Sequence, residues 1–138
     1  MDKFISVYHA LTEENVESIR EIYSSDVHFI DPAHEIRGIE PLLDYFRNLY
    51  ANVIDIGFDF HHPITDGSDA YLQWNMRLSH PRIRGGSEIV LPGSSFLRFN
   101  DDSRVYHHRD YFDLGAMLYE HLPVLGPGVR YIKKRLGS

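Results

Sequence analysis

The spacing of apolar residues changes from helical to strand-like along this chain. Over residues 4–11, 16–23 and 39–50, apolar side chains recur every three or four positions, as they do on one face of a helix. From residue 58 onward they alternate with polar ones, most clearly at Leu72, Trp74, Met76 and Leu78. Such alternation is typical of a half-buried strand. Helices followed by strands predict an α+β domain in which a curved antiparallel sheet wraps around the helices.

Capping and turn residues set the expected boundaries. Thr12 is a suitable N-cap, which predicts two short helices with a kink between them. The second helix is expected to end at 24–26, and a strand over 27–31 to stop at Pro32. Hairpin turns are expected at 66–69 and 100–103. A strand over 87–99 is expected to contain a bulge or a bend at 92–93, and the last strand to cover 104–113.

The end of the sequence has a different character. Residues 114–122 have a helical pattern, 123–128 are rich in proline and glycine, and 129–136 hold four basic residues among apolar ones. We expect one domain over 1–115 and a basic helical tail over 116–138. The tail is expected to pack on the domain or on a partner subunit, although a basic amphipathic segment also suits an acidic surface or a membrane.

Composition excludes several classes of function. The 138 residues suit one domain, and their formal net charge of −6 argues against a nucleic-acid partner. The chain has no cysteine, which rules out disulfides and thiol chemistry. We expect no signal peptide and no membrane span, and therefore a cytoplasmic protein.

Metal and cofactor signatures are also missing. The nine histidines include two adjacent pairs, at 61–62 and 107–108, whose members would point to opposite faces of a strand. We therefore predict no metal site. Gly85 and Gly86 have no following helix for a phosphate loop, and Ser94 and Ser95 lack the closing glycine of a nucleophile elbow. No cofactor is expected.

Three segments resemble one family. Residues 23–32 (YSSDVHFIDP), 37–46 (RGIEPLLDYF) and 105–113 (VYHHRDYFD) are similar to the opening and final segments of SnoaL-like and ketosteroid isomerase-like domains. The resemblance covers roughly residues 4–114 and implies the cone-shaped α+β fold of the nuclear transport factor 2-like superfamily. That fold carries isomerases, cyclases, hydrolases, dehydratases and non-catalytic binders, so the resemblance does not fix an activity.

The resemblance to ketosteroid isomerases implies three site residues. Their catalytic base lies in an Asp-Pro pair after the first strand, which matches Asp31 here. Their tyrosine donor lies just over 20 residues earlier, which matches Tyr8. Their second donor is a protonated aspartate before a run like 97–100, and that position is Ser95 here. A serine hydroxyl is a weaker donor than a neutral carboxylic acid, which argues against steroid isomerisation itself.

The resemblance to SnoaL cyclases implies an acid/base aspartate on the last strand, at Asp110. His108 and Asp110 share one face of that strand, and His107 and Arg109 share the other. Only one pair can therefore look into a pocket. His108 is a further candidate acid/base, because an imidazole changes charge near neutral pH. The candidate pocket walls are Phe29, Phe60, Trp74, Met76 and Ser95.

Each candidate also has a purely structural interpretation. Asp31 suits a turn, Tyr8 suits a core, and Asp110 could pair with an arginine or a histidine. Two hypotheses follow. One is a cofactor-independent isomerase or cyclase that abstracts a proton from a small apolar carbonyl compound. The other is a non-catalytic ligand-binding or regulatory domain. Polar-faced strands carrying Tyr71, Gln73 and Arg77 would allow a homodimer in either case.

Overall fold

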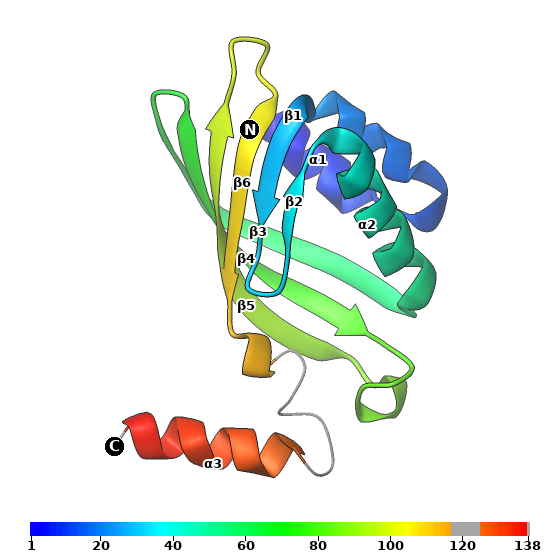
Figure 1. The fold of residues 1–138 in the computed structure, drawn as a ribbon, viewed down its shortest axis with the longest axis vertical. Coiled ribbons are helices and arrows are strands. Elements are labelled where there is room, and N and C mark those ends of the chain that lie inside the picture. The colour runs from blue at the N-terminus through cyan, green and yellow to red at the C-terminus, as the bar shows by residue number, and fades with distance from the viewer. Residues whose placement is uncertain (117–124, 138) are drawn as a thin grey trace.

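The computed structural model of the chain describes residues 1–116 and 125–137 (Figure 1). Helix α1 (Asp2–Ala10) and a 3₁₀ helix (Glu13–Glu21) come first. They are followed by β1 (Tyr23–Ile30), β2 (Glu35–Arg37), α2 (Ile39–Asn52), β3 (Asp55–Asp66) and β4 (Asp69–Ser79). A short 3₁₀ turn (Arg84–Gly86), β5 (Ile89–Phe99), β6 (Val105–Phe112) and α3 (Leu125–Gly137) complete the order.

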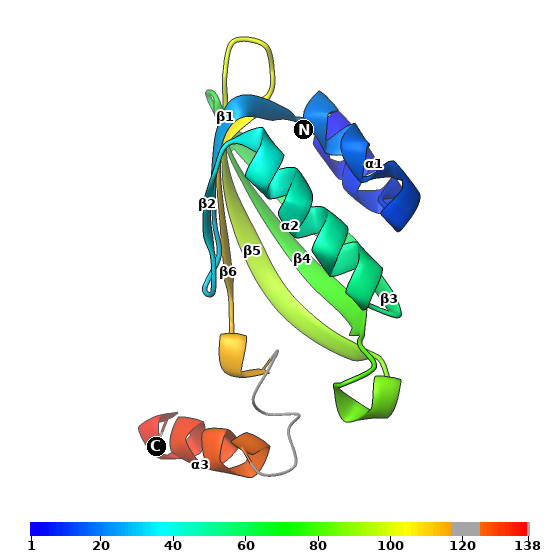
Figure 2. The same ribbon diagram turned by 45° about the vertical axis from the view of Figure 1, so that its right-hand side comes forward.

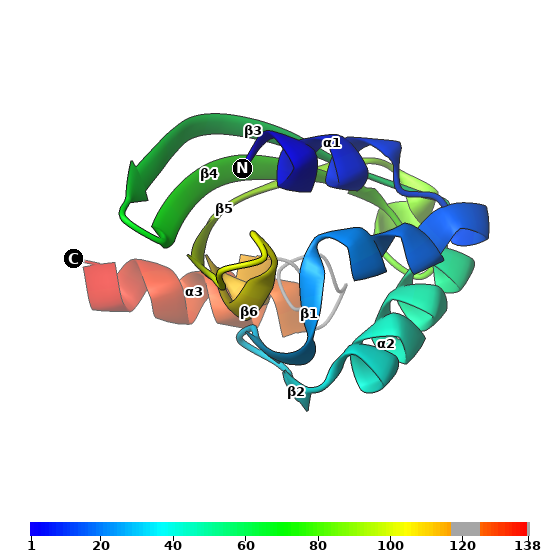
Figure 3. The same cartoon turned by 90° about the horizontal axis from the view of Figure 1, so that it is seen from above.

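The strands form one curved sheet in the order β2-β1-β6-β5-β4-β3. Figures 2 and 3 show this sheet bending around α1 and α2, which lie against its concave side. The α+β prediction is confirmed. The expectation of a wholly antiparallel sheet is wrong at one place, because β1 runs parallel to β6. This pairing joins the first strand to the last and brings together side chains that lie about 80 positions apart in the sequence.

The kink predicted after the first helix has a clear local cause. The backbone N–H of Thr12 donates to Asn15 Oδ1 at 2.6 Å, and the Asn15 amide donates back to the carbonyl of Ala10 at 2.7 Å. These bonds satisfy groups at the junction of the two helices, as a capping box does. The chain thus turns, and both helices place apolar side chains against the sheet.

The first strand begins earlier than predicted, at Tyr23 and not at residue 27. Ile22 and Tyr23 continue the apolar spacing of the helix before them, and that spacing led to the wrong boundary. Their backbone is instead bound to the last strand, because the N–H of Val105 donates to the carbonyl of Ile22 at 2.7 Å. Tyr23 is 2% exposed, so it enters the core from a strand.

The central strands match the predicted alternation. In β4 the side chains of Leu72, Trp74, Met76 and Leu78 are buried. Of the two alternatives predicted at Pro92 and Gly93, the bulge is wrong, because the register of β5 against β4 is continuous through both residues. Gly93 has a packing reason instead: a Cβ there would collide with the ring of Trp74.

The tail contains a helix, α3, beyond the end of β6 (Figure 1). It begins at Leu125, inside the segment predicted to break the helix. Pro127 lies in the first turn of this helix, where backbone N–H groups have no partner within the helix. A proline there therefore costs no hydrogen bond. Lys133 of α3 forms an ion pair with Asp113. Most of the helix predicted over 114–122 lies outside the described residues. Among the described helices, none is both long and apolar enough to cross a bilayer.

Candidate functional site

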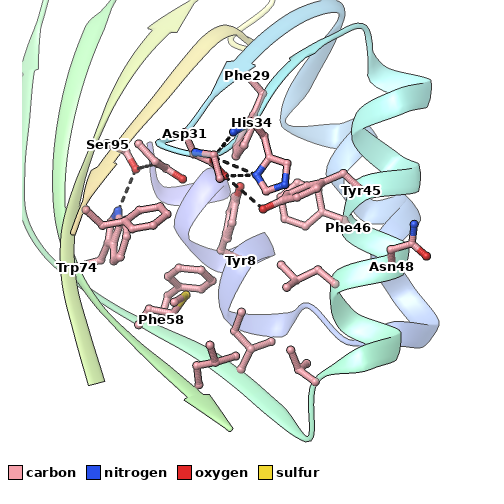
Figure 4. A pocket seen from close by; sticks show the side chains of 18 of the residues that line it. Tyr8, Phe29, Asp31, His34, Tyr45, Phe46, Asn48, Phe58, Trp74 and Ser95 are labelled. Atoms are coloured by element: carbon pink, nitrogen blue, oxygen red, sulfur yellow. Dashed lines mark hydrogen bonds and ion pairs between the residues drawn. The ribbon is translucent and has the colours of Figure 1, made fainter. Parts of the chain in front are cut away.

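A cavity of about 740 Å³ lies between the concave face of the sheet and helices α1 and α2 (Figure 4). Most of its wall is aromatic or aliphatic, from β3, β4 and α2. All nine residues predicted from the sequence line it: Tyr8, Phe29, Asp31, Phe60, Trp74, Met76, Ser95, His108 and Asp110. The fold therefore brings every candidate to one chamber, and the polar candidates belong to two hydrogen-bonded clusters.

The first cluster starts at the only tryptophan of the chain. An indole N–H can only donate, and Trp74 Nε1 donates to Ser95 Oγ at 2.9 Å. The Ser95 hydroxyl in turn lies 2.5 Å from Asp110 Oδ1 and donates to it. Ser95 and Asp110 face each other directly across β5 and β6. The register of these strands thus positions Asp110 at the cavity wall with a donor on one of its oxygens.

The same cluster continues through His108 into the core. His108 Nε2 lies 2.6 Å from Asp110 Oδ1, and His108 Nδ1 lies 2.6 Å from the hydroxyl of Tyr23. The hydroxyl of Tyr23 is 2.5 Å from that of Tyr8. His108 is 2% exposed and its ring packs against Phe29, with centroids 4.7 Å apart. One hydrogen-bonded chain therefore runs from Trp74 through Ser95, Asp110, His108 and Tyr23 to Tyr8. We call it the relay.

Asp110 has the geometry of an available carboxylate. Its side chain is 18% exposed, and every hydrogen bond that the described residues make to it goes to Oδ1. Oδ2 therefore has no partner within the described part of the chain. The Ser95 and His108 donors fix the carboxyl group in place without occupying the second oxygen.

Asp31 is held in a different way. Its Oδ1 accepts the backbone N–H groups of Ala33 at 2.8 Å and His34 at 2.7 Å. Its Oδ2 accepts from the Tyr45 hydroxyl at 3.3 Å, and His34 Nδ1 is within 3.2 Å of both oxygens. The Asp31 side chain is only 4% exposed. The turn and the cavity wall thus use both oxygens of Asp31, as Figure 4 shows.

The tyrosines around the cavity remain neutral hydroxyls. Burial raises the pKa of Tyr8 and of Tyr23 well above the usual value, and for Tyr8 the neighbouring Tyr23 and the charge of Asp110 add to this effect. Burial also raises the pKa of Tyr45, with a further contribution from Asp31. These side chains can therefore donate and accept hydrogen bonds, but they do not ionise to act as phenolate bases.

The last strand has two faces, and only one of its two candidate pairs looks into the cavity. His108 and Asp110 line the cavity, whereas His107 and Arg109 do not. The rings of His107 and His28 are 5.7 Å apart. Burial lowers the pKa of His107, with repulsion from His28 as the next cause. Among the described residues no group of three acidic or histidine side chains is arranged to hold a metal ion.

Sequence reasoning missed Tyr23, which joins His108 to Tyr8. Its position in an apolar helical spacing made it look like a core residue, and only the parallel pairing of β1 with β6 brings its hydroxyl to His108. It also missed Tyr45 and His34 as neighbours of Asp31. Tyr45 lies about two turns into α2 and is not part of its predicted apolar stripe, so the pattern gave no signal for it.

Comparison with known proteins gives the family and the fold. The family model of the SnoaL-like domain matches residues 4–108, which is most of the chain. No curated protein sequence matches.

Several solved structures have the same fold. A candidate SnoaL-like polyketide cyclase from Shewanella denitrificans has a TM-score of 0.71 and 21% identity, covering 84% of this chain and 91% of that chain. A hypothetical protein from Catenulispora acidiphila with a ketosteroid isomerase-like fold, in complex with trimethylamine, gives 0.73 and 13%, covering 85% and 87%. TerC, co-crystallised with polyporic acid, gives 0.73 and 14%, covering 84% and 92%. At these identities the likeness establishes the nuclear transport factor 2-like fold alone.

Proposed function

The chain belongs to the SnoaL-like domain family, and from this premise we propose that it binds a small, largely apolar carbonyl compound and transfers a proton beside its carbonyl group. The single observation that carries the proposal is the hydrogen bonding of Asp110. Its carboxylate lies on the wall of an apolar cavity. Two donors bond to Oδ1, and none of the described residues bonds to Oδ2. An oriented carboxylate in a mostly apolar site is the arrangement that proton abstraction requires.

The chemistry follows from two members of the relay that line the cavity, Asp110 and Tyr8. Asp110 Oδ2 takes the proton from the carbon next to the carbonyl, and the electron pair of that bond moves onto the carbonyl oxygen. The Tyr8 hydroxyl stabilises the resulting enolate, since a donor aimed at developing charge counts most in a dry site. Return of the proton to a different carbon completes an isomerisation. Alternatively, the enolate carbon attacks a second carbonyl of the same molecule, and the proton passes from Asp110 to the new alkoxide oxygen, which completes a cyclisation and restores the base.

Asp31 is the weaker candidate for the base. Both of its oxygens already have partners in the turn and in the cavity wall, so neither is left free to take a proton from a substrate. Its bonds instead hold the turn between β1 and β2. The proposal therefore assigns proton transfer to Asp110 and a structural role to Asp31.

A solvent-exchange assay tests the proposal without knowledge of the natural substrate. The probe is beta-tetralone, an apolar ketone with exchangeable protons, incubated in deuterated water and followed by NMR. Wild-type protein should accelerate exchange, and Asp110→Asn should lower the rate about 100-fold or more, since acid/base groups contribute about 10²–10⁴-fold. Asp59→Asn is the matched control, because Asp59 pairs with Arg77 and does not line the cavity. Equal rates in wild type and Asp110→Asn would refute the role of Asp110.

A second function, ligand binding without turnover, is favoured by one observation. The polar side chains of the relay already form hydrogen bonds with one another. The Ser95 hydroxyl, for example, donates its hydrogen to Asp110 and so cannot donate it to a ligand. In that case beta-tetralone would bind in the cavity, and the intrinsic fluorescence of Trp74 would report it. Wild type and Asp110→Asn would then show the same uncatalysed exchange.

We further propose that residues 1–115 form the SnoaL-like domain and that 116–138 form a separate basic tail. The ion pair between Lys133 and Asp113 supports a tail that folds back to the end of β6. Truncation after residue 115 should leave a folded domain. Its far-ultraviolet circular dichroism should differ from that of the full chain only by the lost contribution of helix α3. A domain that no longer unfolds cooperatively would contradict this boundary.

A further inference from the structure

The direction of the hydrogen bonds in the relay is fixed at one end. Trp74 Nε1 can only donate, so Ser95 must direct its own hydrogen to Asp110 Oδ1. An ionised Asp110 only accepts, so the His108 nitrogen that lies 2.6 Å from the same oxygen carries a hydrogen. His108 Nε2 is therefore protonated in both charge states of the ring that an ionised Asp110 allows.

The direction at the other end depends on the charge of His108. In the neutral ring Nδ1 has no hydrogen, so Tyr23 donates to it and Tyr8 donates to Tyr23. In the imidazolium Nδ1 carries a hydrogen, so it donates to Tyr23 and Tyr23 donates to Tyr8. Tyr8 can then direct its own hydrogen into the cavity that it lines.

We propose that the cavity selects a small aromatic or enolic compound bound as its oxyanion, and that binding is accompanied by uptake of one proton at His108. The proton comes from solvent and is held on Nδ1, while the ligand oxygen accepts the hydrogen bond of Tyr8. This inference rests on the cavity being a ligand site, as proposed above, but it does not require turnover. A ligand that favours one direction of the relay must, by reciprocity, favour the matching charge of His108.

The ionisable groups around His108 are the alternative donors of the proton that we assign to solvent. From β6 the neighbouring ionisable groups are Asp110 and His107, from β1 they are Tyr23 and His28, and from α1 the relay end is Tyr8. Tyr45 and Tyr50 of α2 lie further back. Burial raises the pKa of Tyr8 and Tyr23, so both hydroxyls keep their hydrogens throughout. Asp31, His34, His80 and Arg82 line the cavity as well and have no part in the relay.

The test uses para-nitrophenol, whose phenolate has its own visible absorption. Affinity is measured by calorimetry in two buffers of different ionisation enthalpy, over the mildly alkaline range in which the free probe is already the phenolate. Wild-type protein should take up one proton per bound probe, and its affinity should fall tenfold for each pH unit, as one-proton linkage requires. The bound probe should keep the spectrum of the phenolate.

Tyr23→Phe should remove this dependence. Without the Tyr23 hydroxyl, Tyr8 can donate to the phenolate whatever the charge of His108, so proton uptake should fall to zero. At the alkaline end the variant should bind more tightly than wild type. Tyr50→Phe is the matched control, because Tyr50 is also a buried tyrosine but lies outside the relay and does not line the cavity. It should keep the tenfold dependence.

A measurement on wild type alone guards against misfolding of the variant. The side-chain nitrogen signals of His108 should change from those of a neutral ring to those of an imidazolium when the phenolate binds. Binding without proton uptake, uptake that persists in Tyr23→Phe, or no binding of the phenolate would each overturn the inference. If proton uptake is found but beta-tetralone exchange is not, the relay stands and the catalytic proposal fails.

Discussion

Replacing Asp31 tests whether this residue stabilises the fold and leaves proton transfer to Asp110. Its carboxylate accepts two backbone N–H groups of the turn after β1 and the hydroxyl of Tyr45. Hydrogen bonds to a charged group contribute about 1.5–3 kcal/mol each. We reduce this to about 1 kcal/mol for each amide, because Ala33 and His34 are exposed and water replaces the lost acceptor. The long Tyr45 bond adds less.

Asp31→Ala should therefore lower the free energy of unfolding by about 2–3 kcal/mol, and Asp31→Asn, which keeps one acceptor oxygen, by about 1 kcal/mol. The assay is urea denaturation followed by circular dichroism. With a slope of about 1–3 kcal/mol per molar urea, the midpoint of Asp31→Ala should fall by roughly 1 M. Asp44→Asn is the control, because Asp44 is exposed and pairs only with Arg47 among the described hydrogen bonds. An unchanged midpoint in Asp31→Ala, or an Asp31→Asn variant of normal stability that loses exchange about 100-fold, would refute this assignment.

Two further changes test other parts of the structure. Gly93→Ala should lower stability by about 1–3 kcal/mol through overpacking against Trp74, and the shifted emission of this single tryptophan should report the displaced ring. A normal midpoint would contradict the close approach of Gly93 and Trp74. Burial raises the pKa values of the buried tyrosines, so on raising the pH the unfolded chain loses these protons before the folded chain does. The free energy of unfolding should therefore stay constant below about pH 10 and fall above it, by about 1.4 kcal/mol per pH unit for each tyrosine. Tyr50→Phe should reduce this slope, and a stability that stays flat above pH 10 would contradict the burial.

The sequence predicts most strands and helices of this fold because their patterns are local. Leu72, Trp74, Met76 and Leu78 alternate within one strand, and the stripe of α2 needs no information from outside the helix. The start of β1 could not be found in the same way. Tyr23 has the spacing of the helix before it, and its backbone is fixed by Val105 on a strand far along the chain.

The candidate site shows the same division. The period of two in β6 predicts that His108 and Asp110 share a face, but not which face looks inward. That choice follows from the pairing of Ser95 with Asp110 across β5 and β6. The distinction between Asp31 and Asp110 depends on which oxygens already have partners. No sequence pattern contains that information, because it requires the turn at Ala33 and the position of Tyr45.

The central claim is that Asp110 presents an unoccupied carboxylate oxygen to a ligand in the cavity. Side-by-side rates of deuterium exchange into beta-tetralone for wild type, Asp110→Asn and Asp59→Asn test it most directly. We expect fast exchange in wild type and Asp59→Asn, and a loss of about 100-fold or more in Asp110→Asn while the ketone still quenches Trp74. Exchange at the wild-type rate in Asp110→Asn would contradict the claim.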